Sequence, residues 1–449
     1  MGMSKHTIKE LQELQALPLN LKIALTRDRI REWVNTYGED GVYLSFSGGK
    51  DSTVLLHIIR QMYPQIKAVF YDTHLEFPEL RAFVKTFSNV EFVGADKTFS
   101  EVITEYGYPL ISKEVAECVH DARKYLTELA QTTTLLKTDR QTDRQTDRQT
   151  DAASIVWGLI GEQEEKKPQE QPSFLEYAKA KVNEHRIPLN NKILNCERLI
   201  DVVANKTTGS GKRLRLARLL GMVDRNNQIR ANIPKEEKSD FNHERYAFLL
   251  VAPFEISSYC CNVFKKHPAH RFARQNDMKP ITAQMASESR LRLQKWLING
   301  CNAFDADNPI SNPMSMWTEG DVLLYIHEHW DEMVEWRKQE SGREDITRPV
   351  CEVYGELKLV SGGVDGVDPS ICGIFDPGYQ VYQFTGYDRT GCFCCGFGLQ
   401  IEEEPRLLKL KESHPKLYQA LVKPKSEHGI GYGEMIDWIN ENGGFEIEY

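Results

Sequence analysis

The stretch VYLSFSGGKDSTVLLHII, at residues 42–59, decides the expected fold. Its first residues form an apolar run typical of a buried strand, and after a break apolar residues return at helical spacing. Between the two runs lies Ser-Gly-Gly-Lys-Asp-Ser, at residues 47–52. Two glycines at such a turn let the backbone approach a ligand closely, and the first amides of a helix favour an anion.

This turn predicts a site for a nucleotide bound with a divalent cation. We expect all of its residues to contact that ligand: Ser47, Gly48, Gly49, Lys50, Asp51 and Ser52. Lys50 adds a positive charge, whereas the Asp51 carboxylate would repel phosphate unless Mg²⁺ lay between them. The alternative is a tight turn in which Asp51 only caps the following helix.

Strands and helices alternate after this turn. Strands are expected at 42–46, 66–72 and 90–94, and helices at 52–63, at 77–87 and from about 97, with two further helices within 5–37. Such alternation predicts an α/β fold with a parallel sheet and helices on both faces. Ligands bind such sheets at the carboxyl ends of the strands.

Asp72 and Thr73 follow the second expected strand. We therefore expect both residues to meet the same nucleotide as the first turn. The alternative for Asp72 is a cap on the next turn.

Composition narrows the class of protein. The 449 residues carry a net charge of −9, with 41% hydrophobic and 27% charged residues, so the chain as a whole is not a basic coat for nucleic acid. The longest apolar run, at 246–254, is too short to span a membrane. The N-terminus lacks the apolar segment of a signal peptide, and we expect a cytoplasmic protein with ten reduced or metal-bound cysteines and no membrane partner.

The middle of the chain breaks the alternating pattern. The unit Thr-Asp-Arg-Gln repeats from Thr138 to Asp151 without an apolar residue, which predicts a solvated low-complexity insertion or, alternatively, a binding arm. Residues 206–230 are basic, with leucines between the arginines. This stretch is either a helix with a solvated basic face or a contact for a phosphate backbone.

The cysteines are clustered. Cys392 and Cys395 form a Cys-x-x-Cys pair between glycines, and Cys260 and Cys261 are adjacent. Four thiolates suit a [4Fe–4S] cluster or structural zinc, and adjacent cysteines favour the cluster over a zinc knuckle. Ordinary core thiols are the third alternative.

The other cysteines have weaker claims on a metal. Cys301 and Cys394 are reserve ligands. The remaining four are expected to act as small apolar residues: Cys118, Cys196, Cys351 and Cys372. Trp317 is likewise expected in the core rather than stacked on a base.

Together these motifs resemble the phosphoadenosine phosphosulfate (PAPS) reductase family of the PP-loop ATP pyrophosphatase superfamily. SFSGGKDST is similar to its PP-loop, FYDTHLEFPEL to its second motif, and PMSMWTEGDVLLYI at 313–326 to a later one. The Cys-Cys and Cys-x-x-Cys pairs resemble the [4Fe–4S] signature of adenylyl-sulfate reductases.

The resemblance covers about 22–126 and 240–400 and implies a Rossmann-like fold of the adenine nucleotide α-hydrolase type. The expected divisions are helices at 1–40, a nucleotide-binding half at 41–126, the insertion and basic segment at 127–240, the rest of the reductase-like domain with the cysteines in a mostly helical or irregular region at 241–400, and a helical tail at 401–449.

Two departures from the reductases shape the functional hypothesis. No cysteine follows Cys395, so the C-terminal thiol that attacks the sulfonucleotide in those enzymes is missing. The intact Gly-Gly-Lys-Asp resembles the loops of enzymes that cleave ATP between the α- and β-phosphates.

The resemblance therefore implies a sulfurtransferase that adenylates an acceptor, releases pyrophosphate and delivers sulfur with the help of the cluster. Lys50, Asp51 and Ser52 would be catalytic, with ATP and Mg²⁺ bound. Ser112, Lys113, Arg290 and Arg292 would add phosphate contacts, unless the two arginines belong to a salt-bridged surface helix.

The implied partners are a sulfur donor, such as a cysteine desulfurase, or a reductant such as thioredoxin or ferredoxin. The acceptor is a small molecule, a tRNA base or DNA, as in DNA phosphorothioation. Two alternatives remain: a sulfonucleotide reductase that releases sulfite, and a non-catalytic nucleotide- and cluster-binding component of a larger assembly.

Overall fold

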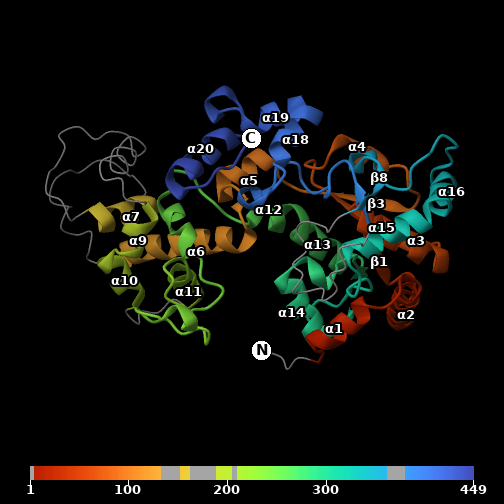
Figure 1. Cartoon of the computed structure of the whole chain (residues 1–449), viewed down its shortest axis with the longest axis horizontal. Coiled ribbons are helices and arrows are strands. Elements are labelled where there is room, and N and C mark those ends of the chain that lie inside the picture. The colour runs from red at the N-terminus through yellow and green to blue at the C-terminus, as the bar shows by residue number, and fades with distance from the viewer. Residues whose placement is uncertain (1–4, 133–151, 162–188, 205–209, 362–379) are drawn as a thin grey trace. The chain divides into compact units, whose positions relative to one another are not determined.

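The computed structural model describes residues 5–132, 152–161, 189–204, 210–361 and 380–449, whose elements Figure 1 labels. The chain divides into two compact units. The first comprises Met1–Asp96 and Val263–Phe393, and the second comprises Lys97–Asn262 and Cys394–Tyr449. These divisions differ from those expected at 126, 240 and 400, because packing joins stretches that are far apart in the chain.

The first unit contains a sheet with its helices, followed by a β-hairpin. Its elements are α1 (Ile8–Gln15), α2 (Leu19–Tyr37), β1 (Val42–Ser45), α3 (Lys50–Met62), β2 (Lys67–Asp72), α4 (Pro78–Val84), β3 (Val90–Gly94), α13 (His267–Gln275), β5 (Lys279–Ile281), η5 (Ala286–Glu288), α14 (Arg290–Asn299), β6 (Asn302–Ala303), β7 (Ile310–Ser311), α15 (Glu319–Glu328), α16 (Trp330–Ser341), η6 (Glu352–Tyr354), β8 (Leu357–Ser361) and β9 (Gln380–Phe384).

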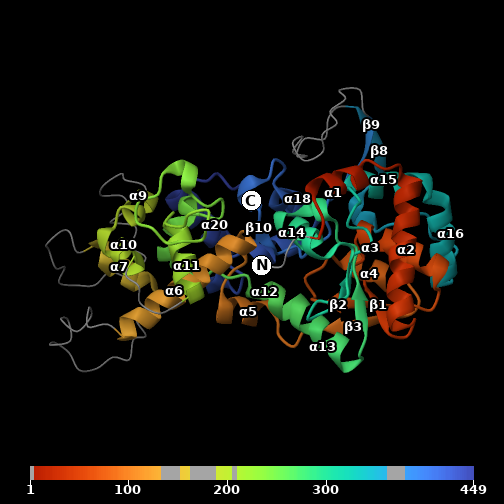
Figure 2. The ribbon, with the colours of Figure 1, turned by 90° about the horizontal axis from the view of Figure 1, so that it is seen from below.

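The sheet has the order β3-β2-β1-β5-β7-β6. Its first five strands run parallel, and only β6 is antiparallel to its neighbour β7. Figure 2 shows β1, β2 and β3 side by side. This arrangement confirms the α/β Rossmann-like fold expected from the alternating pattern, and the expected strands at 42–46, 66–72 and 90–94 coincide with β1, β2 and β3.

Burial explains why these residues form these elements. Val42, Tyr43 and Leu44 of β1 are all buried, which accounts for an apolar run without alternation. Helix α3 is also buried over most of its length, because it packs against α2 and α15. Trp317 lies in the same core, where its indole Nε1 donates a hydrogen bond to Thr26 Oγ1 over 2.9 Å, as a buried indole requires.

The second unit is mostly helical. Its elements are α5 (Phe99–Tyr106), β4 (Leu110–Ile111), α6 (Lys113–Thr132), α7 (Ala152–Gly161), α9 (Leu189–Leu194), α10 (Glu197–Ala204), α11 (Ser210–Leu219), η2 (Lys235–Glu237), η3 (Glu244–Val251), α12 (Tyr259–Cys261), β10 (Gly396–Phe397), η7 (Leu399–Ile401), α18 (Arg406–Ser413), α19 (Pro415–Val422), η8 (Lys425–Glu427) and α20 (Tyr432–Gly443). The π-helical turn η4 (Asn262–Lys266) connects α12 to α13 of the first unit.

Helix α6 packs against α7, α11 and η3, and β4 pairs in parallel with β10. The structure changes one interpretation of the insertion: Val156 and Trp157 of α7 are buried, so 152–161 belongs to the core of this unit. The repeat from Thr138 to Asp151 lies outside the described residues. The expected helical tail is present as α18, α19 and α20.

No helix within the described ranges is both long enough and apolar enough to cross a membrane.

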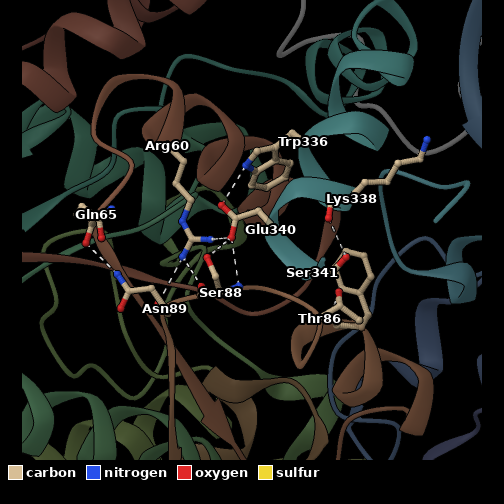
Figure 3. Close-up of polar contacts among 10 residues, drawn as sticks. Arg60, Gln65, Thr86, Ser88, Asn89, Trp336, Lys338, Glu340 and Ser341 are labelled. Carbon is tan, nitrogen blue, oxygen red and sulfur yellow. Dashed lines mark hydrogen bonds and ion pairs between the residues drawn. The ribbon is translucent and has the colours of Figure 1, made fainter. Parts of the chain in front are cut away.

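A buried ion pair connects α3 to α16 in the first unit (Figure 3). Arg60 donates to Glu340 Oε2 over 2.5 Å and to the carbonyl of Ser88 over 2.7 Å. Glu340 also accepts from the Ser88 amide and hydroxyl and, over 3.2 Å, from Trp336 Nε1. The carboxylate therefore accepts from four donor groups of three residues, and its loss would leave the Arg60 guanidinium buried without an anion.

We predict that Glu340→Ala lowers the free energy of unfolding by about 3 kcal/mol, the scale for breaking one side of a buried ion pair. The double variant Arg60→Met/Glu340→Leu should lose less, because no charge is then left unpaired. Urea denaturation followed by circular dichroism measures both. Glu335→Ala, at an exposed position of the same helix, is the control and should cost under about 0.5 kcal/mol. Equal losses in the single and double variants would contradict this account.

His57 of α3 is buried against Tyr325, whose hydroxyl lies 2.9 Å from His57 Nδ1. Burial lowers the pKa of His57 to about 4. The unfolded chain, with a pKa of about 6.5, therefore binds more protons than the folded chain between these values. Stability is lost as the pH falls from about 6.5 towards 4, by up to about 3 kcal/mol.

We predict that His57→Gln flattens this acid limb of the stability profile, although it lowers stability at neutral pH. Urea midpoints measured between pH 4 and pH 7.5 test the change. His270→Gln, at an exposed position of α13, is the matched control and should leave the limb in place. An unchanged slope in His57→Gln would assign the acid sensitivity to other groups.

Candidate functional site

The 47–52 turn follows β1, the strand at which the order of strand addition across the sheet reverses. From β1 the chain proceeds to β2 and β3 on one side, and β5 and β7 lie on the other side of β1. In open α/β sheets, ligands bind at such a switch point, beyond the carboxyl ends of the strands. The turn follows directly after Ser45, the last residue of β1.

Two glycines shape this turn. Gly48 has φ of 72°, and a Cβ there would lie 2.6 Å from Val84 Cγ2 of α4, so both the backbone and the packing require glycine. Gly49 is the N-cap of α3 and provides no side-chain cap. The N-terminus of a 13-residue helix therefore opens towards the turn.

The hydroxyls of the turn form hydrogen bonds with other groups of the same turn. Ser47 Oγ and Ser52 Oγ lie 3.0 Å apart, and Ser52 and Thr53 each donate to the Gly49 carbonyl over 3.0 Å. The Ser47 amide also reaches Ser52 Oγ, over 3.3 Å. These bonds hold the glycine backbone in a defined shape.

Lys50 brings a buried cation to the turn, with its side chain 6% exposed. Its Nζ lies 2.9 Å from Glu319 Oε1 and donates to the Asp388 carbonyl over 2.9 Å, while its amide donates to the Tyr354 hydroxyl over 2.9 Å. Burial lowers the pKa of Lys50, but the nearby acidic groups, with Asp51 the largest, outweigh it and raise the pKa. The ammonium is therefore held charged among oxygen acceptors.

Asp51 points to a cation at the same place. Its Oδ1 is buried and makes no hydrogen bond within the described part of the chain. Burial raises the pKa of Asp51 and Glu319 acts in the same sense, whereas the cations of Lys50, Arg389 and Arg292 act in the opposite sense. A buried carboxylate with these cationic side chains nearby suits a polyanion bound through a divalent cation.

The loop after β2 is tightly bonded. Asp72 accepts from the His74 amide over 3.1 Å and from Arg81 over 2.7 Å. Although burial raises the pKa of Asp72, these bonds outweigh it and lower the pKa. Thr73 donates to Glu76 over 2.7 Å. The carboxyl end of β2 thus carries a fixed carboxylate, but Asp72 is already paired with Arg81 of α4.

Among the further phosphate contacts expected from the sequence, Lys113 and Arg290 are exposed, and their roles remain predictions. Arg290 is the first residue of α14. Arg292, two residues later, acts to lower the pKa of Asp51 through its charge and pairs with Glu288. Lys113 begins α6 in the second unit. It follows Ile111, a β-branched residue at φ of 67°, a strained backbone conformation that often marks a functional position.

The second unit brings three of the cysteines near one buried tyrosine. The charges of Cys394, Cys395 and Cys260 all act on Tyr432, although burial is the largest cause of its raised pKa. Tyr432 donates to the Cys394 carbonyl over 2.5 Å. Cys260, Cys261 and Cys395 are half-buried, whereas Cys394 is buried.

Cys392 belongs to the first unit, where its Sγ lies 3.9 Å from Thr73 Oγ1. In the described ranges, no group of three or more cysteine, histidine or carboxylate side chains is close enough to hold a metal ion. The donor chemistry of Cys260, Cys261, Cys392 and Cys395 suits iron or zinc. The metal assignment remains a prediction.

Several remaining cysteines follow the expectation from sequence. Cys118, Cys351 and Cys301 are buried, Cys196 is half-buried, and Cys372 lies outside the described residues. Burial raises the pKa of Cys118 and of Cys351 to about 11 in each case. These two thiols are therefore poorly suited to reaction as thiolates.

The basic stretch is largely paired within its own unit. Arg215 of α11 contacts Glu117 over 2.5 Å and Asp121 over 2.7 Å, and Lys212 contacts Glu128 over 2.5 Å. These charges stabilise the packing of α11 on α6, which favours the interpretation as a structural basic helix.

The sequence missed three residues beside the turn: Glu319, Tyr354 and Arg389. Glu319 lies within the quoted 313–326 motif. Tyr354 and Arg389 give no local signal, because folding alone brings them to a turn about 300 residues earlier.

Residues 41–155, which contain the glycine turn and the first three strands of the parallel sheet, match the family model of the phosphoadenosine phosphosulfate reductase domain. This match confirms, for that part of the chain, the resemblance expected from the motifs. A comparison with curated proteins gave no match.

Proposed function

We propose that this protein is a PP-loop ATP pyrophosphatase that adenylates an acceptor and then exchanges the activated oxygen for sulfur. One observation carries the proposal: Asp51, whose Oδ1 is buried without a hydrogen bond in the described part of the chain, lies in the first turn of α3, where the charges of Lys50, Arg292 and Arg389 act on it. Cationic side chains, a helix N-terminus and a buried carboxylate are the groups that a magnesium–triphosphate complex needs.

In the proposed first step, an acceptor oxygen attacks the α-phosphorus of ATP. The bond from that phosphorus to the bridging oxygen breaks, and pyrophosphate leaves with its electron pair. The amides at the start of α3 and the Lys50 ammonium would stabilise the charge on the leaving group. Mg²⁺, held by Asp51 and the phosphates, would supply further charge neutralisation. The role of the protein is to position the reactants and stabilise the developing charge.

In the proposed second step, sulfur at the oxidation level of hydrosulfide forms a bond to the acceptor, and AMP leaves with the original oxygen. A cysteine desulfurase would supply the sulfur, and thioredoxin or ferredoxin the electrons. A [4Fe–4S] cluster on Cys260, Cys261, Cys392 and Cys395 would bind or relay that sulfur. Cys394 is a poor carrier of a persulfide, because it is 3% exposed.

The acceptor is proposed to be a small molecule or nucleic acid, a tRNA base or DNA, in the cytoplasm. The family match also supports a second candidate, a sulfonucleotide reductase that releases sulfite. The intact Gly-Gly-Lys-Asp of the turn favours the pyrophosphatase over the reductase. The products separate the two candidates: AMP and pyrophosphate from ATP in one case, and sulfite from adenylyl sulfate or PAPS in the other.

We predict that the protein, purified without oxygen, hydrolyses magnesium ATP to AMP and pyrophosphate with water in place of the acceptor, and that Lys50→Ala lowers the rate about 100-fold, the scale for removing one charge-stabilising donor. Lys85→Ala, at an exposed position beyond α4, is the matched control and should retain the rate. Chromatography of the nucleotides and a coupled pyrophosphate assay give both products. If sulfite were released while ATP stayed intact, the reductase would replace the proposed function.

We predict that the same preparation carries about four irons and four sulfides per chain. Cys260→Ser, Cys261→Ser, Cys392→Ser and Cys395→Ser should each lose most of the iron, since each removes one thiolate. Cys196→Ser, at a half-buried position, is the control and should keep it. Iron, sulfide and zinc assays on the same sample make the measurement. Stoichiometric zinc without iron would make these cysteines structural.

A further inference from the structure

The anion-binding groups of the PP-loop are already occupied by oxygens of the protein itself. The Tyr354 hydroxyl accepts the first amide of α3 over 2.9 Å. The Lys50 ammonium has two oxygen partners, the Asp388 carbonyl and the Glu319 carboxylate, each at 2.9 Å. The Lys50 amide and ammonium are the donors that a bound phosphate would use.

One of these groups, the Asp388 carbonyl, comes from a short segment, Asp388–Cys392, which we name the strap. Asp388, Arg389 and Gly391 are exposed, whereas Tyr354 beneath them is buried. Thr390 lies 2.9 Å from the Tyr354 hydroxyl and links the strap to it. A Cβ on Gly49 would meet both oxygens at 3.3 Å, so the strap closes directly over the turn.

Charge explains why the strap lies there. A buried ammonium is costly unless oxygens pair with it. The strap provides one neutral carbonyl, and Glu319 provides one carboxylate that is 54% exposed. A nucleotide's β- and γ-phosphates carry more negative charge and more acceptors than these groups, so they should compete successfully for Lys50.

The other end of the strap is attached to the loop after β2. Cys392 Sγ lies 3.9 Å from Thr73 Oγ1, and the amide of Phe393 donates to the Leu75 carbonyl over 2.8 Å. The strap therefore extends from the PP-loop to the second motif, and its last residue is the first cysteine of the Cys-x-x-Cys pair.

We propose that Tyr354 and the strap occupy the phosphate-binding position of the PP-loop, that is, the Lys50 amide and ammonium. The pyrophosphate end of the nucleotide displaces them and thereby repositions Cys392. This inference rests on the proposed function, because it takes the nucleotide site as given. It makes Tyr354 a positioning residue that opposes nucleotide binding. The apparent affinity for the nucleotide falls because only the molecules whose phosphate-binding position is vacant can bind it.

The test is the affinity of Tyr354→Phe, in the full chain purified without oxygen, for magnesium pyrophosphate and for magnesium ATP, measured by titration calorimetry. The variant keeps the ring, which packs on Phe384, and removes only the hydroxyl. Both ligands should bind about fivefold more tightly than to the wild type, the factor that one neutral hydrogen bond provides. Tyr382→Phe, on β9, is the control and should not change either affinity.

Weaker binding by Tyr354→Phe would overturn the proposal, because the hydroxyl would then be a ligand contact rather than a competitor. Unchanged affinity, or no binding of either ligand to either protein, would overturn it as well.

Hydrogen exchange gives a second readout that does not depend on the variant. The Gly386 amide donates to the Tyr354 carbonyl over 2.7 Å, and the Phe393 amide donates to Leu75. On addition of magnesium pyrophosphate, peptides covering 386–393 should exchange faster, while those covering β8 should not change. Slower or unchanged exchange at 386–393 would overturn the proposal.

The two hypotheses fail separately. If ATP yields AMP and pyrophosphate but neither the affinity nor the exchange changes, the proposed function stands and the strap does not. If both ligands open the strap but no AMP forms, the strap stands and the proposed function does not.

Discussion

A buried ammonium at the start of a helix is the constraint on which the first unit depends. Lys50 is held at the N-terminus of α3, where the helix dipole and the lysine charge have the same sign. Such an arrangement is unfavourable by itself and stable only with oxygens nearby. Glu319, Tyr354 and the strap supply those oxygens in this structure, and the geometry of the turn remains open to better ones.

The sheet determines where this constraint is placed. Strands β2 and β3 lie on one side of β1, and β5 and β7 lie on the other. Loops from both halves of the first unit therefore converge at the carboxyl end of β1. Arg292 comes from the segment after β5 and Arg389 from the segment after β9, yet both act on Asp51. A site assembled in this way needs the parallel sheet, but its composition is set by loops that the sheet does not specify.

This division explains how far the sequence could lead. Apolar runs and glycines are local signals, so β1, β2, β3 and the PP-loop turn could be predicted from the residues that form them. The division into two units depends on non-local packing and could not. Helix α7 was obscured by the polar repeat before it, although Val156 and Trp157 needed only a partner surface, which α6 provides. Tyr354 and Arg389 reach the turn only through the fold.

The same reasoning bears on the cysteines. Spacing alone made Cys392 and Cys395 a pair, because two residues between thiols allow both to face one centre. In the structure, the backbone between them passes from one unit to the other, and Cys394 is buried with its carbonyl bonded to Tyr432. Cys392 instead contacts Thr73, at the end of β2. The first cysteine of the pair is thus held against the loop after β2. Any ligand that moves the strap must therefore change the constraint on a residue only three positions from Cys395.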